Sequence, residues 1–263
     1  MVVPSVLKRI LQRKSEEIEE SKSILSINDL VAKSKNCPPT RGFENSLCQA
    51  LQHGSGVIAE VKKASPSAGI IRENFKPKEI AISYAQAGAA CLSVLTDRDF
   101  FQGSPEYLQQ AREACYLPVL RKDFIIDPWQ VYESRVMGAD CVLLIVSALE
   151  QSSLHDLLGL AKEIGMDVLI EVHDEAEMER ALQLDHDLIG VNNRNLNTFE
   201  TSLSTSERLK KMLSGEQVLV TESGIKTVGD VIRMRSSGID SFLVGEAFMR
   251  ETDPGQALKR MFF

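Results

Sequence analysis

Lysines and glutamates recur at the ends of short apolar runs in this sequence, where they are able to perform acid–base chemistry. The recurring polar residues are Glu60, Lys62, Lys122, Glu171, Asn192 and Glu222. A lysine ammonium can protonate a carbonyl oxygen, and a carboxylate can remove a proton. A structural ion pair would explain one such Lys–Glu pair equally well, because a buried charge needs a partner. Two lysines with several glutamates and an asparagine favour a functional site.

Turns that contain glycine and serine follow the last two apolar runs and indicate a phosphate site. These turns are Ser223-Gly224 and Gly245-Glu246. In parallel barrels the corresponding turns often bind phosphate through backbone N–H groups and a short helix N-terminus. The segment SPSAG at 65–69 adds hydroxyl groups and a flexible loop that can close over the anion.

The few aromatic residues are placed unevenly. Phe100 and Phe101 are adjacent in a loop, where two phenyl rings are difficult to bury together, so one is expected either to pack or to line an apolar ligand pocket. Core packing is the simpler expectation for Phe124 and for Trp129.

Eight apolar, β-branched runs alternate with longer amphipathic segments from residue 56 onward. The runs cover 56–62, 91–97, 118–124, 140–146, 167–172, 188–193, 217–223 and 241–248. Such alternation predicts a parallel sheet covered by helices. Eight units favour an α/β fold closed as a (β/α)₈ TIM barrel, with a doubly wound open sheet as the alternative. In a barrel the polar strand ends would meet at one mouth.

Residues 1–50 lie outside this alternation. We predict two helices there, at about 5–20 and 27–35, followed by a proline turn. The segment either plugs one end of the barrel or helps to close the substrate site. With no linker or repeat array, the sequence predicts a single domain over 1–263, with an N-terminal helical extension (1–50) and the barrel (56–263).

Charge and composition exclude several classes of function. A formal net charge of −7 at pH 7 disfavours nucleic-acid or membrane-surface partners. The five cysteines lack CxxC spacing, which predicts a reducing, cytoplasmic location. The four histidines are not paired as metal ligands, so no metal is expected, and no cofactor motif is present. No apolar stretch is long enough for a membrane span.

Several long motifs in this order resemble the indole-3-glycerol-phosphate synthases of tryptophan biosynthesis. They are EVKKASPS (60–67), SVLTDRDFFQGS (93–104), LRKDFIID (120–127), LIEVHD (169–174), IGVNNRNL (189–196), TESGI (221–225) and LVGEAFMR (243–250). The resemblance implies a monofunctional, cofactor-free carboxy-lyase that is a monomer or a weak homo-oligomer. Its phosphorylated small-molecule substrate would be 1-(2-carboxyphenylamino)-1-deoxyribulose 5-phosphate, and its products indole-3-glycerol phosphate, CO₂ and water.

The resemblance also implies a role for each matching position. The general acid falls on Lys122, the general base on Glu171, and a substrate-contacting lysine on Lys62. Further polar positions of the site are Glu60, Asn192 and Ser223, with Arg194 in support. Phosphate-binding positions fall on Ser65, Gly224, Gly245 and Glu246, and the aromatic pocket on Phe101, Phe124 and Leu196.

Two positions qualify the resemblance. Ala68 stands where many relatives have a basic residue, which bears on loop contacts but not on the reaction. Glu246 is acidic at a phosphate position, so its backbone N–H is expected to face the anion. The rival predictions are another phosphate-binding barrel, such as phosphoribosylanthranilate isomerase, and a barrel that only binds a ligand or partner. The Lys and Glu strand ends disfavour both.

Overall fold

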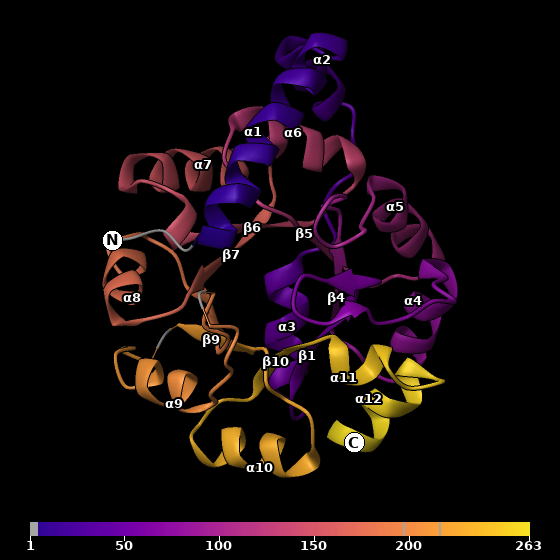
Figure 1. The fold of residues 1–263 in the computed structure, drawn as a ribbon, viewed down its shortest axis with the longest axis vertical. Coiled ribbons are helices and arrows are strands. Elements are labelled where there is room, and N and C mark those ends of the chain that lie inside the picture. Colours follow the sequence, from indigo (N-terminus) through magenta and orange to yellow (C-terminus); the bar gives the residue numbers. More distant parts are fainter. Residues whose placement is uncertain (1–4, 197, 216) are drawn as a thin grey trace.

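Eight parallel strands close into a barrel in the computed structural model, which describes residues 5–196, 198–215 and 217–263 (Figure 1). The strands are β1 (Gly56–Val61), β4 (Cys91–Leu95), β5 (Val119–Lys122), β6 (Cys141–Ile145), β7 (Asp167–Val172), β8 (Leu188–Asn192), β9 (Val218–Glu222) and β10 (Ser241–Val244). Pairing of β1 with both β4 and β10 closes the ring. The predicted (β/α)₈ barrel is confirmed, and the open sheet is excluded.

Helices surround the barrel, and their starts follow from local sequence. They are α4 (Pro77–Gln86), α5 (Pro105–Ala114), α6 (Pro128–Met137), α7 (Gln151–Glu163), α8 (Glu175–Ala181), α9 (Ser204–Lys210), α10 (Val228–Ser236), α11 (Glu246–Met249) and α12 (Pro254–Phe262), with the 3₁₀ turn η1 (Val146–Ala148). Side chains of Ser104, Asp127 and Thr227 cap three of them by accepting backbone N–H groups. Prolines occupy the first turn of α4, α5, α6 and α12, where no N–H is needed.

Strand alternation divides the core into two layers. On β1, Val57, Ala59 and Val61 pack outward against the helices, whereas Ile58 packs inside the barrel. Glu60, two residues beyond Ile58, therefore also points inward, at the carboxyl-terminal end of the strand. The interior is filled by side chains below this level, so only the mouth is open to a ligand.

The N-terminal segment, described from residue 5 onward, contains three helices instead of the predicted two. They are α1 (Ser5–Ile24), α2 (Ile27–Ser34) and α3 (Phe43–Leu51). No strong local signal marks α3, because a helix this short is stabilised mainly by tertiary packing. Phe43 and Leu47 are fully buried in the inner cluster, so α3 closes the amino-terminal end of the barrel.

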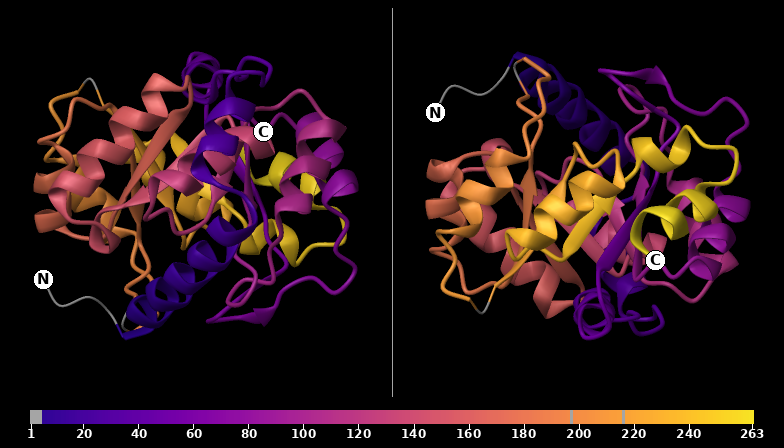
Figure 2. Two further views of the ribbon diagram at one scale, coloured as in Figure 1. Left: turned by 90° about the horizontal axis from the view of Figure 1, so that it is seen from above. Right: turned by 90° about the horizontal axis from the view of Figure 1, so that it is seen from below.

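The other end of the same segment lies at the carboxyl-terminal mouth (Figure 2). Lys22 of α1 forms an ion pair with Asp127 at 2.8 Å, and the indole Nε1 of Trp129 donates to the Leu25 carbonyl at 2.8 Å. Trp129 is buried as expected, but it also joins α6 to the N-terminal segment. Of the two roles considered for residues 1–50, α3 has that of the plug, and α1 lies beside the mouth.

Seven of the eight observed strands end before the predicted runs do, and the last strand shows the largest difference. The last strand stops at Val244, because the chain turns at Gly245 and begins α11 at Glu246. A small antiparallel hairpin, β2 (Ala64–Ser65) with β3 (Gly69–Ile70), follows β1 and contains the turn of the SPSAG loop. Within the described ranges, no helix is both long enough and apolar enough to cross a membrane.

A buried carboxylate joins the N-terminal segment to the base of the barrel. Asp140 is fully buried and accepts the backbone N–H groups of Arg41 and Val119, each at 2.8 Å, as well as the guanidinium of Arg112. Its removal would leave these donors without a partner in a dry environment.

We predict that Asp140→Ala lowers the free energy of unfolding by about 3 kcal/mol, because breaking a buried ion pair leaves an unpaired charge. Urea denaturation measures the change, and Asp156→Ala, at an exposed position of α7, is the control with no expected change. A loss below about 1 kcal/mol, typical of a surface pair, would contradict the anchoring role.

Candidate active site

One cavity of 480 Å³ at the carboxyl-terminal mouth collects every predicted site residue. They are Glu60, Lys62, Ser65, Phe101, Lys122, Phe124, Glu171, Asn192, Arg194, Leu196, Ser223, Gly224, Gly245 and Glu246. These residues come from both halves of the chain and from strands around the whole ring. Closure of the barrel, which places all carboxyl ends of the strands at one rim, brings them together.

Lys122 lies between two carboxylates in the floor of this cavity. Its Nζ donates to Glu171 Oε2 and to Glu222 Oε2, each at 2.7 Å. Burial by itself would lower the pKa of Lys122, but the two carboxylates outweigh burial and raise the pKa well above its usual range. Lys122 therefore carries a proton at neutral pH.

Glu171 is held ionised by its neighbours. Besides Lys122, its Oε1 accepts Asn192 Nδ2 at 3.2 Å and lies 3.3 Å from His173 Nε2. Burial would raise the pKa of this carboxyl, but Lys122 and then His173 lower it below its usual range. A buried carboxylate that stays charged can accept a proton once a ligand draws Lys122 away from it.

Glu222 is a cavity residue to which the sequence prediction assigned no role. Burial first, and then the nearby Glu171 charge, raise the pKa of Glu222 despite the attraction of Lys122. Its Oε1 is buried and has no hydrogen-bond partner among the described residues. Gly190 makes room for it, because a Cβ there would overlap that oxygen. Its position at the end of a strand, like that of Glu171, could have predicted from the sequence that Glu222 belongs to the site.

A second Lys–Glu pair lies at the carboxyl-terminal end of β1, where Lys62 directly follows the strand. The Nζ of Lys62 donates to Oε2 of Glu60, and Glu60 is almost fully buried. Gly245 borders this pair, since a Cβ at position 245 would overlap Glu60 Oε2. Glycine at 245 thus allows the backbone after β10 to approach the pair closely.

An apolar wall forms one side of the cavity. Phe101 and Phe124 have ring centroids 6.1 Å apart with planes tilted by 40°, and Leu196 also lines the cavity. The loop with Phe101 is fixed by Asp97, whose Oδ1 accepts the Phe100 and Phe101 backbone N–H groups at 2.9 and 3.2 Å. Phe124 thus lines the cavity beside Phe101, where simple core packing had been the first expectation.

The opposite rim consists of backbone turns and arginines. Ser223 and Gly224 both adopt positive φ, at 62° and 88°, and the Ser223 carbonyl accepts Asn193 Nδ2 at 3.0 Å. Left-handed backbone is uncommon for serine and clusters at functional sites. Asn193, beside the predicted Asn192, is therefore a buried structural support for this turn.

Arg194 connects the turns of this rim. Its guanidinium donates to Ser67 Oγ at 2.7 Å and lies 3.8 Å from Glu246 Oε2, while Arg250 pairs with Glu246 Oε1 at 2.8 Å. The Glu246 carboxylate thus lies against arginines. Arg194 brings a cation to the SPSAG loop, in which Ala68 carries none.

His173 extends the polar network behind Glu171. It follows Glu171 by two residues, so strand alternation turns both side chains to the same side. This spacing could have predicted from the sequence that His173 lies near the site. Its Nδ1 lies 3.0 Å from Oε2 of the buried Glu177, which also accepts the His173 backbone N–H at 2.9 Å. Burial would lower the pKa of His173, but Glu171 and Glu177 raise it to about 10. Among described residues, no group of three or more His, Cys, Asp or Glu side chains could hold a metal ion.

The family model for indole-3-glycerol phosphate synthase matches residues 7–261 of the chain. Solved structures with a similar fold include 3-hexulose-6-phosphate synthase from Salmonella typhimurium, with a TM-score of 0.60 at 14% identity over 78% of this chain and 96% of that one. Tryptophan synthase subunit alpha from Legionella pneumophila has a TM-score of 0.59 at 14% identity, over 85% and 97% of the two chains. At these identities the structures show a shared fold alone.

The charge of His173 predicts a pH-dependent contribution to stability. A pKa raised from 6.5 to about 10 means that the contribution is complete below about pH 6.5 and is lost as pH rises toward 10. We expect His173→Gln to lower the free energy of unfolding more at about pH 6 than at about pH 10, as measured by urea denaturation. The exposed His155→Gln is the control. An equal loss at both pH values would contradict a charged His173.

Proposed function

The chain belongs to the indole-3-glycerol phosphate synthase family, whose members are carboxy-lyases of tryptophan biosynthesis. We propose that it forms the indole ring from 1-(2-carboxyphenylamino)-1-deoxyribulose 5-phosphate. The products are indole-3-glycerol phosphate, CO₂ and water. A phosphorylated, sugar-like substrate is typical of the family.

The observation that supports this most strongly is the placement of Lys122. Its ammonium lies in a cavity with an aromatic wall on one side and glycine-containing turns on the other. The substrate has three matching parts: an aromatic ring, a central ketone and a terminal phosphate. Ring binding against Phe101 and Phe124, and phosphate binding at the turns after β9 and β10, would place the ketone between them, near Lys122.

Lys122 acts as the general acid in ring closure. It protonates the ketone oxygen while the ring carbon that bears the carboxylate attacks the ketone carbon and forms the new C–C bond. Loss of CO₂ then leaves its bonding electrons on the ring and restores benzene aromaticity. As the ammonium turns to the ketone, Glu171 loses its closest cation and becomes more basic.

Dehydration completes the indole. Glu171 removes a proton from the carbon next to the ring nitrogen, and the hydroxyl leaves as water after Lys62 or Lys122 protonates it. Over the whole reaction the substrate takes up two protons, at the ketone oxygen and at the leaving hydroxyl, and releases one from carbon. The net uptake of one proton balances the loss of a carboxylate as neutral CO₂. Glu222, with its raised pKa, is placed to return a proton to Lys122.

Backbone groups bind the phosphate in this proposal, and an arginine supports the loop beside them. Gly224, Gly245 and the backbone N–H of Glu246 face the anion, and Ser65 closes the loop by accepting the Ala68 N–H at 3.2 Å. Arg194 holds that loop through Ser67. Asn192 orients Glu171, and Lys62 balances the substrate carboxylate.

We expect Lys122→Ala and Glu171→Gln each to reduce kcat at least about 10²-fold, because each removes a positioned acid or base. The measurement is formation of fluorescent indole product from the authentic substrate without added metal or cofactor. Lys63→Ala is the matched control, since Lys63 neighbours Lys62 but does not line the cavity.

Circular dichroism of each variant excludes unfolding as the cause. A wild-type protein that forms no indole from authentic substrate would overturn the assignment. A Lys122→Ala variant with normal turnover would instead favour a barrel that binds a ligand without this chemistry.

A further inference from the structure

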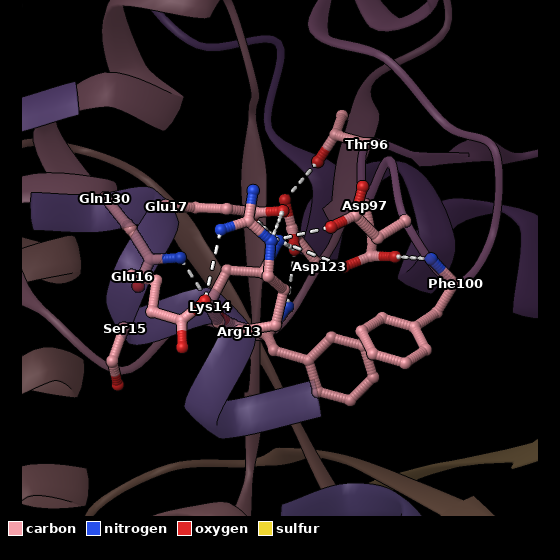
Figure 3. Close-up of polar contacts among 12 residues, drawn as sticks. Arg13, Lys14, Ser15, Glu16, Glu17, Thr96, Asp97, Phe100, Asp123 and Gln130 are labelled. Carbon is pink, nitrogen blue, oxygen red and sulfur yellow. Dashed lines mark hydrogen bonds and ion pairs between the residues drawn. The ribbon is translucent and has the colours of Figure 1, made fainter. Parts of the chain in front are cut away.

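A lysine of the N-terminal helix is buried among carboxylates just outside the catalytic cavity. Lys14 of α1 is only 5% exposed, and its Nζ lies 3.0 Å from Asp97 Oδ2, 3.0 Å from Asp123 Oδ1 and 2.7 Å from Glu17 Oε2 (Figure 3). Asp97 follows β4 and Asp123 follows β5, so one ammonium joins α1 to two neighbouring loops of the barrel mouth.

The lysine in this cluster is charged at neutral pH. Burial would lower the pKa of Lys14, but Asp123 and Asp97 outweigh burial and raise it well above the usual range. Asp97 and Asp123 are themselves 1% and 3% exposed, so water does not replace the lysine as their partner. Removing the ammonium would leave two close carboxylates, which repel one another in a low dielectric.

Asp97 carries the contact from Lys14 to the first aromatic residue of the cavity. While Oδ2 lies against the ammonium, Oδ1 accepts the backbone N–H groups of Phe100 and Phe101. The Asp97 carbonyl also accepts Gly103 N–H at 2.7 Å. A shift of this one side chain therefore moves the segment that contains Phe101.

Asp123 carries the contact to the second aromatic residue. Its Oδ1 accepts the Phe124 backbone N–H at 2.8 Å and also lies against the Lys14 ammonium. Oδ2 accepts Thr96 Oγ1 at 2.6 Å and Arg121 Nη2 at 3.1 Å. The orientation of Phe124 thus depends on the same carboxylate that Lys14 holds.

We propose that Lys14 is a positioning residue that fixes the Phe101–Phe124 wall against which the aromatic ring of the substrate binds. Lys14 does not line the cavity and acts through Asp97 and Asp123. The inference rests on the proposed function for the identity of the ring, but the placement of the wall follows from the contacts alone.

Attachment of α1 to the barrel does not explain this arrangement. Arg13 pairs with Asp99 at 2.7 Å, Lys22 pairs with Asp127, and Trp129 donates to Leu25. These contacts hold the helix at the mouth without Lys14. Arg121 also pairs with Asp123, whereas Lys14 is the cation that pairs with both Asp97 and Asp123.

The test is a comparison of Lys14→Met with Lys22→Met in the full-length protein. Both variants remove an α1 lysine that pairs with the barrel, but Lys22 pairs with Glu19 of its own helix and with Asp127, the cap of α6. For Lys14→Met we expect KM for the substrate to rise about tenfold while kcat stays within about threefold, since ring binding is lost in the ground and transition states alike. The inhibition constant of inorganic phosphate, which reports on the opposite rim, should be unchanged. Lys22→Met should change none of the three.

An unchanged KM in Lys14→Met would overturn the inference. An inhibition constant of phosphate that rises together with KM would also overturn it, because general loosening of the mouth would weaken the binding of both substrate and phosphate. If Lys14→Met does not fold, Lys14→Met/Asp97→Asn, which removes one charge of each sign, is compared with wild type under the same two criteria. Failure of the proposed function is separate: the wild-type protein would then not convert the substrate at all.

Discussion

The ion pairs of the Lys122 ammonium with the buried carboxylates of Glu171 and Glu222 are the interaction on which the rest of the mouth depends. Each carboxylate needs the cation, because a buried charge without a partner is strongly unfavourable. The cation in turn holds the two carboxylates in different states, with the pKa of Glu171 below its usual range and that of Glu222 above. Two chemically identical side chains thus obtain different capacities for proton transfer from their surroundings.

Keeping these charges in place constrains residues that perform no chemistry. Gly190 leaves the space that Glu222 Oε1 occupies, and Gly245 leaves the space for Glu60. His173 and Glu177 extend the network behind Glu171, and Asn193 holds the strained turn at Ser223. The cost of strain and burial at the mouth is offset by the packed layers of apolar side chains beneath it.

The N-terminal segment acts on both ends of the barrel. At the base, α3 fills the interior with Phe43 and Leu47 and is joined through Arg41 to Asp140. At the mouth, α1 inserts Lys14 beneath the loops that carry the aromatic wall. The connection through α2 packs along α6, so one continuous segment contacts both the base and the mouth.

The sequence by itself determined the eight strands and the barrel, because apolar runs and the polar residues that end them are patterns local to the chain. The family and most of the cavity lining followed from the resemblance of its longer motifs to known enzymes. It did not determine α3, whose 9 residues are stabilised as a helix by burial of Phe43 and Leu47 in the barrel. Only the tertiary structure decided which charges meet. The partners of Lys122 are 49 and 100 residues away in sequence, and no local pattern pairs Lys14 with the loops it contacts. These contacts between residues far apart in sequence arise because the ring closes and because α1 runs beside its mouth. The pKa shifts of Glu171 and Glu222 depend on those contacts and on burial, so they appear only once the chain has folded.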